Sequence, residues 1–371
     1  MKVGIPSEVK NNEFRVAITP AGVHELVRHG HEVYVQQGAG LGSSITDAEY
    51  VAAGGAILPT ADEVWAIADL LLKVKEPIEE EYHRLRKDQT LFTYLHLAAS
   101  RPCTDALIAS GTTAIAYETV ETADRRLPLL APMSEVAGRL APQVGAYHLM
   151  RAAGGRGVLP GGVPGVAAGK AVVIGGGVSG WNATQIAVGM GFHVTLLDRD
   201  INKLKEADKV FGTKVQTVVS NSFELERACL EADLVIGAVL IPGAKAPKLV
   251  TNELVSRMKP GSVLVDIAID QGGCFEDSHP TTHAEPTFRV HNSVFYCVAN
   301  MPGAVPNTST HALTNATLPY ILELADRGWA EALRRDAALA KGLNTHDGKV
   351  VYREVAEAHG LEHTELSALL G

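Results

Sequence analysis

The sequence predicts an α/β protein of two doubly wound domains, of which the second is inserted into the first. Short apolar runs, typical of buried strands, alternate with helical segments along most of the 371 residues. This alternation is typical of layered α/β domains with mostly parallel sheets. A helical region then resumes at Thr308, after the last predicted strand, and should pack back on the first domain. We therefore expect one domain in two parts, 1–132 and 306–371, separated by an inserted domain at 133–305.

The N-terminal part alternates regularly between strands and helices. Its first helix is expected to be capped by Thr19, to begin at Pro20 and to end before Gly30. The predicted strands are residues 2–6, 31–37, 56–58, 69–75, 90–96 and 113–118. The predicted helices between them are residues 20–28, 47–53, 61–68, 79–87 and 103–110. Lys75 and His96 each end a predicted strand, and ligands of parallel sheets bind outside the carboxyl ends of the strands.

A long helix is predicted at residues 133–153, where the chain leaves the first domain. Pro142 lies inside this segment. Because a proline in a helix interior costs ~3 kcal/mol, we expect a kink or a break there. The glycine-rich loop 154–169 then leads into the inserted domain.

The inserted domain is organised around a glycine turn. The apolar run 170–174 predicts a buried strand, and Gly175, Gly177 and Gly180 follow it with G-x-G-x-x-G spacing. A helix at 179–190 and a second strand at 193–198 come next. In this arrangement the first glycine permits a tight turn, and the second lets a pyrophosphate approach the backbone. The third glycine lets the helix pack close to the strand.

This order of elements predicts a Rossmann-like dinucleotide site, although a glycine turn alone would also fit a structural strand end. Asp198, at the end of the second strand, can accept hydrogen bonds from the adenosine ribose. Arg199 could pair with a 2′-phosphate, but Asp198 would repel one, so we expect NAD rather than NADP. Further strands at 214–219, 233–238, 262–267 and 294–298, with a helix at 222–231, bring the domain to six strands.

The C-terminal region is predicted to be a helical return to the first domain. Its helices are expected at residues 311–327 and 329–339. With the dinucleotide domain inserted between the two parts of the other domain, the cleft between the domains is the expected active site.

Composition excludes several classes of function. The chain has 46% hydrophobic and 20% charged residues, and its net charge of −9 without a Lys/Arg cluster argues against nucleic-acid binding. The N-terminus lacks the apolar segment of a signal peptide, and no run approaches the ~18 apolar residues of a membrane span. The four cysteines are far apart and are expected to be reduced, buried thiols. We therefore expect a cytoplasmic protein without a membrane partner.

Several stretches carry a resemblance that spans nearly the whole chain. They are residues 4–8 (GIPSE), 12–20 (NEFRVAITP), 73–77 (KVKEP), 93–98 (TYLHLA), 133–138 (MSEVAG), 175–180, 265–273 (VDIAIDQGG), 298–302 (VANMP) and 312–317 (ALTNAT). With these stretches the chain resembles the alanine dehydrogenase and nicotinamide nucleotide transhydrogenase superfamily, and within it the alanine dehydrogenases. The resemblance implies reversible, NAD-dependent oxidative deamination of L-alanine to pyruvate and ammonia, in a homohexamer that serves amino-acid catabolism.

The resemblance also implies roles for four residues. Arg15 and Lys75 would hold the substrate, Arg15 through a bidentate fork to its carboxylate. His96 and Asp270 would form the catalytic pair, because deamination needs a group that moves protons near neutral pH and a carboxylate that orients water. Structural alternatives remain open. Arg15 could be a solvated loop charge and Lys75 half of a surface ion pair with Glu76 or Glu79. His96 could be a satisfied strand-end histidine, and Asp270 a turn residue.

The cofactor contacts implied by the resemblance gather at strand ends, where backbone groups can supply most of them. Besides the glycine turn and Asp198, they are Ser134, Val178, Lys203, Ser220, Val239, Leu240, Ile267, Ala268, Ile269, Asp270, Val298, Ala299, Asn300 and Met301, with His279 as a weaker candidate in a loop. Some members of the family bind magnesium through a Glu and a His one helical turn apart. Here Arg327 stands four residues after Glu323, so we expect an ion pair and no metal.

Two related functions remain as alternatives. A transhydrogenase subunit that binds NAD would share the glycine turn but would lack the joint presence of His96 and Asp270. An opine or lysine-type dehydrogenase would need a larger substrate pocket. For the oligomer, residues 133–153 and 308–327 are the candidate interface elements.

Overall fold

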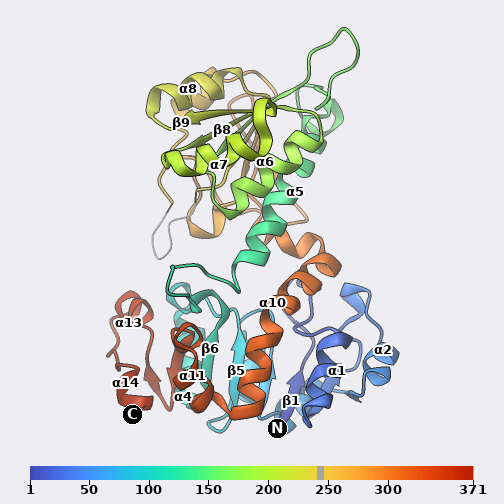
Figure 1. The fold of residues 1–371 in the computed structure, drawn as a ribbon, viewed down its shortest axis with the longest axis vertical. Coiled ribbons are helices and arrows are strands. Elements are labelled where there is room, and N and C mark those ends of the chain that lie inside the picture. Colours follow the sequence, from blue (N-terminus) through green and yellow to red (C-terminus); the bar gives the residue numbers. More distant parts are fainter. Residues whose placement is uncertain (240–245, 371) are drawn as a thin grey trace. The chain divides into compact units, whose positions relative to one another are not determined.

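The computed structural model describes residues 1–239 and 246–370 of the chain. The chain forms two compact units (Figure 1). Unit 1 comprises Met1–Met133 and Val305–Gly371, and unit 2 comprises Ser134–Ala304. Each unit is an α/β fold with helices packed on a central, mostly parallel sheet, as the sequence predicts.

In the described part of unit 1 the sheet has eight strands in the order β15-β14-β6-β5-β4-β1-β2-β3. The strands from β6 to β3 are parallel, whereas β14 is antiparallel to β6 and β15 to β14. Strand order reverses between β1 and β4, which are neighbours although β2 and β3 separate them in sequence. The bounds are β1 Lys2–Ile5, β2 Glu32–Gln36, β3 Ala56–Leu58, β4 Leu70–Leu72, β5 Thr90–Thr93, β6 Thr113–Ala116, β14 Leu343–His346 and β15 Lys349–Val350.

The helices of unit 1 begin where the sequence supplies caps. The Thr19 hydroxyl accepts the N–H of Gly22 at the start of the first helix, and Thr46 and Thr60 form capping boxes with glutamates three residues on. The α-helices are α1 Pro20–Arg28, α2 Asp47–Ala52, α3 Ala61–Ile67, α4 Arg101–Ser110, α10 Pro306–Arg327, α11 Trp329–Arg335, α12 Ala337–Ala340, α13 Arg353–His359 and α14 Ser367–Leu370. Short 3₁₀ helices are η1 Leu41–Ser43, η2 Glu79–Arg84, η3 Leu97–Ala99 and η4 Tyr117–Thr119.

Among residues 134–239 and 246–304, seven strands form the sheet of unit 2 in the order β12-β13-β11-β10-β7-β8-β9. All neighbours are parallel except β12 and β13. The strands are β7 Lys170–Ile174, β8 His193–Asp198, β9 Val215–Val219, β10 Leu234–Gly237, β11 Val263–Asp266, β12 Thr287–Val290 and β13 Ser293–Tyr296. The helices are α6 Val178–Gly189, α7 Ile201–Phe211, α8 Ser222–Glu231 and α9 Asn252–Arg257, with 3₁₀ turns η5 Arg151–Ala153, η6 Gly212–Lys214, η7 Ile269–Gln271 and η8 Met301–Ala304.

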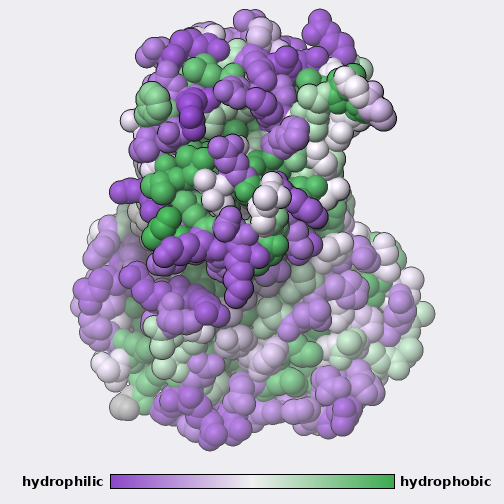
Figure 2. All heavy atoms as spheres, turned by 45° about the horizontal axis from the view of Figure 1, so that its top comes forward, coloured by the Kyte–Doolittle hydropathy of each residue, from purple (hydrophilic) through white to green (hydrophobic). Residues whose placement is uncertain are grey.

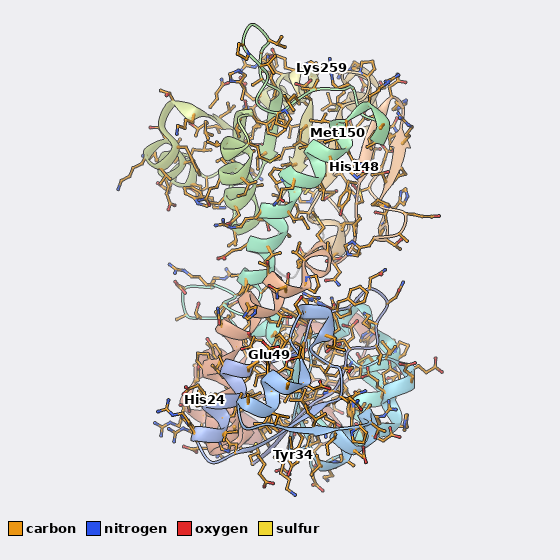
Figure 3. The ribbon with its side chains drawn as sticks, turned by 90° about the vertical axis from the view of Figure 1, so that its right-hand side faces the viewer. His24, Tyr34, Glu49, His148, Met150 and Lys259 are labelled. Carbon is orange, nitrogen blue, oxygen red and sulfur yellow. The ribbon has the colours of Figure 1, made fainter. Side chains whose placement is uncertain are left out.

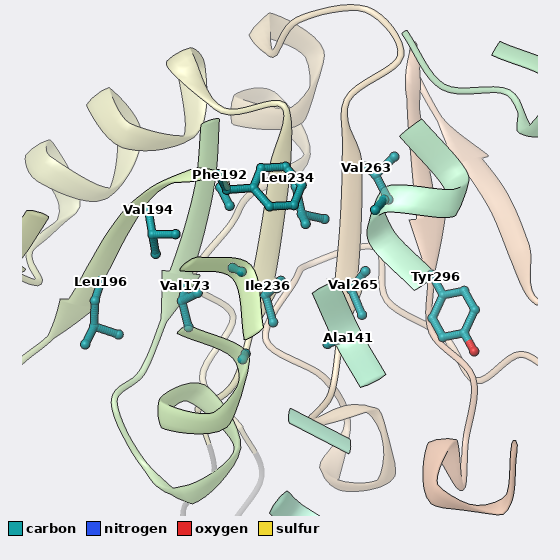
Figure 4. Close-up of a cluster of buried hydrophobic side chains, with 14 of the residues drawn as sticks. Ala141, Val173, Phe192, Val194, Leu196, Leu234, Ile236, Val263, Val265 and Tyr296 are labelled. Atoms are coloured by element: carbon teal, nitrogen blue, oxygen red, sulfur yellow. The ribbon is translucent and has the colours of Figure 1, made fainter. Parts of the chain in front are cut away.

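Helix α5, Ala131–Leu149, supplies part of the core of unit 2. Ala141 on this helix packs in one cluster with Val173, Ile236 and Val265 of the sheet (Figure 4). The helix approaches α6 closely, because a Cβ atom at Gly138 would lie only 2.2 Å from the carbonyl oxygen of Ser179. His148 lies in the last turn of α5, just before Met150 (Figure 3).

Several sequence predictions need correction. The sequence predicts a kink or a break at Pro142, and helix α5 runs through this residue without a break. The region after Trp329 is not purely helical, since β14 and β15 add two strands to unit 1. Unit 2 gains β12, which the sequence reading missed. The predicted strands ending at Lys75 and His96 are shorter than expected, so both residues lie in loops three residues after a strand. The segment predicted as a helix at 79–87 is the 3₁₀ helix η2.

The surface mixes hydrophilic and hydrophobic side chains (Figure 2), and the four cysteine thiols are buried. Hydrophilic side chains cover much of the face drawn in Figure 2, with hydrophobic ones exposed between them. Within the described residues, no helix combines the length and the apolar character needed to cross a bilayer. The four cysteines are buried free thiols, as predicted, and burial raises the pKa of each to about 12.

Candidate active site

The glycine turn of unit 2 lies where the order of its sheet reverses. Strand β7 has β10 on one side and β8 on the other, and a crevice for ligands forms at such a point. Gly175 follows β7 with a φ of 100°. A Cβ atom there would lie 2.9 Å from the oxygen of Ala238 and 3.0 Å from the side chain of Val239, both in the loop after β10. The turn is therefore tight, as the sequence predicts.

The other two glycines of the motif differ in their surroundings. A Cβ atom at Gly180 would lie 1.7 Å from the oxygen of Gly175, so α6 packs directly on the turn. A Cβ atom at Gly177 would meet nothing within 4 Å. Gly177 is also the N-cap of α6 and forms no side-chain cap, while Val178 begins the helix with an exposed side chain. The start of this helix therefore offers open backbone to an anionic group.

Asp198 connects the glycine turn to the next strand. Its Oδ2 accepts the N–H of Gly176 at 2.6 Å, and its Oδ1 accepts the N–H of Asp200 at 2.8 Å. Lys203 Nζ lies 3.5 Å from Oδ2, and the N–H of Ser220 donates to the Asp198 carbonyl at 2.9 Å. The predicted cofactor residues Asp198, Lys203 and Ser220 thus gather beside the turn. Open backbone at Gly177, an uncapped helix start and a carboxylate at the end of β8 fit a dinucleotide.

The loop after β11 carries the predicted catalytic residue Asp270. Asp270 is exposed and lies in η7, next to buried Ala268 and Ile269. The loop is held by Asp266, a buried carboxylate that the sequence reading missed. Asp266 accepts hydrogen bonds from the N–H groups of Ala268, Cys274 and Phe275, and from the Ser278 hydroxyl at 2.5 Å. An aspartate at a strand end ahead of the glycine pair 272–273 is the signal that could have revealed this role.

The remaining predicted cofactor residues have varied surroundings. Val298 and Met301 are buried in the unit 2 core. Ala299 and Asn300 are half-buried, as are Ser134, Val239 and Ile267. His279 is exposed and its ring lies 3.7 Å from that of Phe288, between centroids. Leu240 lies outside the described residues.

In unit 1 the loops after β4 and β5 bring Lys75 and His96 together. The Nζ atom of Lys75 lies 3.5 Å from Nε2 of His96. The two strands are parallel neighbours, with Leu72 opposite Phe92, so residues that follow them by a few positions meet at one edge of the sheet. Lys75 is half-buried and His96 exposed. Glu76, one possible surface partner of Lys75, forms an ion pair with Lys10.

A glutamate that the sequence reading missed holds the His96 loop. Glu118, in η4 after β6, accepts the N–H of His96 at 2.7 Å and the N–H of Leu95 at 3.2 Å. Its Oε1 also lies 3.8 Å from His96 Nδ1. His96 has a φ of 48°, a left-handed conformation that costs of order 1–3 kcal/mol in a non-glycine residue. The ring of Tyr94 is parallel to that of His96, with centroids 5.9 Å apart. Glu118 thus fixes the backbone at His96, while Tyr94 lies beside its ring.

Arg15 is a buried ion-pair partner rather than a solvated loop charge. Only 2% of it is exposed, and Glu13 accepts hydrogen bonds from its Nε at 2.6 Å and its Nη2 at 2.5 Å. Nη1 lies 3.1 Å from Sδ of Met133. Burial alone disfavours the charged guanidinium, but the hydrogen bonds and charge of Glu13 raise the pKa of Arg15. A substrate carboxylate that binds this guanidinium must share it with Glu13.

The predicted substrate and catalytic residues are divided between the units. Arg15, Lys75 and His96 belong to unit 1, and Asp270 belongs to unit 2. On α10, Arg327 Nε lies 2.6 Å from Glu323 Oε2, which confirms the predicted ion pair.

Comparison with known proteins gives a consistent assignment. Residues 4–137 match the N-terminal domain and residues 141–353 the C-terminal domain of the alanine dehydrogenase/PNT family. An alanine dehydrogenase of Mycolicibacterium smegmatis is 68% identical over 370 residues and all of both chains. A solved L-alanine dehydrogenase, 51% identical, superposes with a TM-score of 0.95 over 97% of this chain and 99% of its own. A transhydrogenase from Sinorhizobium meliloti, 27% identical, superposes with a TM-score of 0.83 over 95% of this chain and 100% of its own. The chain therefore belongs to the alanine dehydrogenase/PNT family.

Proposed function

We propose that the protein is an NAD-dependent L-alanine dehydrogenase, which converts L-alanine and water to pyruvate and ammonia, reversibly. The observation that carries the proposal is the pair of Lys75 Nζ and His96 Nε2, 3.5 Å apart at the carboxyl edge of a parallel sheet. An ammonium beside a titratable imidazole suits an α-keto acid, whose anionic and carbonyl oxygens need a cation and whose chemistry needs a proton carrier. The full-length similarity to proteins named alanine dehydrogenases supports this substrate.

NAD would be held by unit 2. We propose that the pyrophosphate binds at Gly177 and the start of α6, and that Asp198 accepts hydrogen bonds from the adenosine ribose. When bound, NAD supplies the acceptor for the hydride that leaves Cα of alanine. Asp198 favours NAD over NADP, because its carboxylate would repel a 2′-phosphate.

The residues of unit 1 would hold the substrate and move protons. Arg15 would contact the substrate carboxylate while Glu13 keeps the guanidinium oriented. Lys75 would contact the keto oxygen of pyruvate as a compact point charge. His96 would take and return protons at Nε2 while water adds to the imine of the substrate and ammonia leaves. Asp270 would orient that water or stabilise positive charge on the imine.

The similar fold of the Sinorhizobium meliloti transhydrogenase supports the transhydrogenase alternative. Its sequence is only 27% identical to this chain, however, whereas an alanine dehydrogenase is 68% identical. The two functions differ in one simple property. An alanine dehydrogenase reduces NAD with L-alanine alone, whereas a transhydrogenase subunit turns over only with its partners. An opine or lysine-type dehydrogenase would instead need a larger amino-acid substrate.

The test is absorbance of NADH with purified protein, NAD and L-alanine at alkaline pH. Wild type should produce NADH, and His96→Ala and Asp270→Asn should each abolish the signal, while His96→Ala should still bind NADH. A signal that survives both substitutions would keep the enzyme and refute the catalytic pair. No signal from a folded wild type that binds NADH would favour the transhydrogenase or another amino-acid substrate.

We further propose that the protein forms a homohexamer and acts in the cytoplasm, as the family resemblance implies. Mass photometry of the purified protein tests the hexamer, because a particle of one, two or four times the 39.3 kDa chain mass would contradict it.

A further inference from the structure

A buried cluster of charges lies behind Lys75, at the point where strand order reverses in unit 1. Lys73 is fully buried, and its Nζ lies 3.2 Å from Oε2 of Glu8 and 2.9 Å from Oε1 of Glu81. Both glutamate side chains are 2% exposed. Burial by itself lowers the pKa of Lys73, but the two carboxylates raise it above its ordinary value; burial also raises the pKa of Glu8, against the effect of the Lys73 charge. The three groups come from the loops after β1 and β4 and from η2.

Glu8 differs from Glu81 because it also binds the backbone next to Lys75. Its Oε1 accepts the N–H of Val74 at 2.6 Å, and its Oε2 lies 3.4 Å from the N–H of Lys75 as acceptor. Glu81 instead accepts the N–H of Ile78 at 3.1 Å, within its own turn. The register explains the contact of Glu8. Gly4 of β1 pairs with Leu71 of β4, and Glu8 and Lys75 each follow these partners by four residues.

We propose that Glu8 is a positioning residue for the substrate, which acts by fixing the backbone that carries Lys75 beside His96. The proposal rests on the proposed role of Lys75 in binding the keto acid. A lysine has a flexible four-carbon stem, so the position of its ammonium depends on where its Cα is held. The Glu8 carboxylate holds the N–H groups of Val74 and Lys75, while Lys73 holds the carboxylate in place. Glu8 is buried and needs no contact with the substrate.

The experiment compares Glu8→Gln with Glu81→Gln in the full-length protein, with pyruvate, ammonia and NADH as substrates. Both variants remove one carboxylate from Lys73, but only Glu8→Gln disturbs the acceptors of the Val74 and Lys75 N–H groups. We expect Glu8→Gln to raise KM for pyruvate roughly tenfold and to change KM for NADH by less than about twofold. Glu81→Gln should leave KM for pyruvate within about twofold of wild type. Equal effects of the two variants on KM for pyruvate would show a general loss of packing and overturn the proposal.

A double-mutant cycle with Lys75→Gln tests whether Glu8 acts through Lys75. In the Lys75→Gln background, Glu8→Gln should lower kcat/KM for pyruvate by less than about twofold. If the losses of kcat/KM in the two single variants multiply in the double variant, the Glu8 proposal is wrong and the role of Lys75 stands. If Lys75→Gln alone leaves kcat/KM unchanged, the role of Lys75 fails, and that of Glu8 fails with it. Should Glu8→Gln not fold, the cycle is repeated with Glu8→Asp, which keeps a negative charge beside Lys73 but shortens the side chain that reaches the N–H groups of Val74 and Lys75.

Discussion

Alanine substitutions at three glycines of unit 2 should distinguish an effect on cofactor binding from an effect on packing. The three are Gly177, Gly180 and Gly189. A Cβ atom at Gly180 would lie 1.7 Å from the oxygen of Gly175, and the two atoms must separate by more than an ångström to reach a tolerable contact. Overpacking of this kind costs ~1–3 kcal/mol. At Gly177 a Cβ atom meets no protein atom within 4 Å, and the same is true of Gly189 at the other end of α6. The same substitution to alanine should therefore have three different results.

We expect Gly180→Ala to lower the thermal unfolding midpoint of unit 2, by ~2–4 °C for each kcal/mol in a unit of about 170 residues. Gly177→Ala should leave this midpoint unchanged and weaken NADH binding about tenfold to a hundredfold, because its methyl group takes the space of the pyrophosphate. This loss corresponds to ~1.5–3 kcal/mol of charge-assisted hydrogen bonding. Gly189→Ala is the control, neutral or stabilising by up to ~1 kcal/mol, with unchanged affinity.

The assays are calorimetric unfolding of each variant without cofactor and fluorescence titration with NADH. Wild-type affinity in Gly177→Ala would mean that the pyrophosphate does not approach this backbone, and the cofactor assignment of the turn would be wrong. Wild-type stability in Gly180→Ala would show that α6 can move away from β7 at no cost.

Two further predictions concern Asp198 and His148. Asp198→Ala should raise kcat/KM for NADPH relative to that for NADH at least about tenfold, because the carboxylate that repels a 2′-phosphate is gone. The ratio is measured by reductive amination of pyruvate with each cofactor. An unchanged ratio would contradict the position of Asp198 at the adenosine ribose. Burial lowers the pKa of His148, so its contribution to stability is complete above the ordinary value of 6.5 and is lost as the pH falls below it. Thermal unfolding between pH ~5 and ~8 should therefore show a smaller loss of stability at acidic pH in His148→Gln than in wild type, and parallel curves would refute this.

The strands that the sequence predicts are those whose burial comes from apolar side chains. Runs such as 70–72 and 263–266 are buried on both faces and contain mostly leucine and valine, which is the pattern of a parallel sheet. Strand β14 has the opposite composition, since Asn344 and Thr345 are buried and polar. The Asn344 side chain donates to Thr119 and to the Gly342 carbonyl, both at 2.9 Å. Only the fold supplies these partners, so polarity alone predicts a loop.

The candidate active site could likewise be predicted from the sequence only in part. Lys75 and His96 could be found because they follow strand ends, and all three of Arg15, Lys75 and His96 lie in stretches that resemble a known family. The roles of Glu8, in a loop after a predicted strand, and of Glu118, at the end of another, could not be found, because only strand register reveals their contacts. The register of β5 and β6 pairs Thr93 with Ala116, which places Glu118 level with Leu95.

Each of the three basic residues of unit 1 that are proposed to face the substrate has a glutamate carboxylate behind it. A buried guanidinium or a left-handed histidine costs free energy that its own side chain cannot offset. Glu13 holds Arg15, and Glu118 holds the backbone of His96. Glu8 does the same for the loop of Lys75. In unit 1 each of the three basic residues proposed to bind the substrate therefore has an acidic residue behind it, and a search that follows only the basic residues misses these three glutamates.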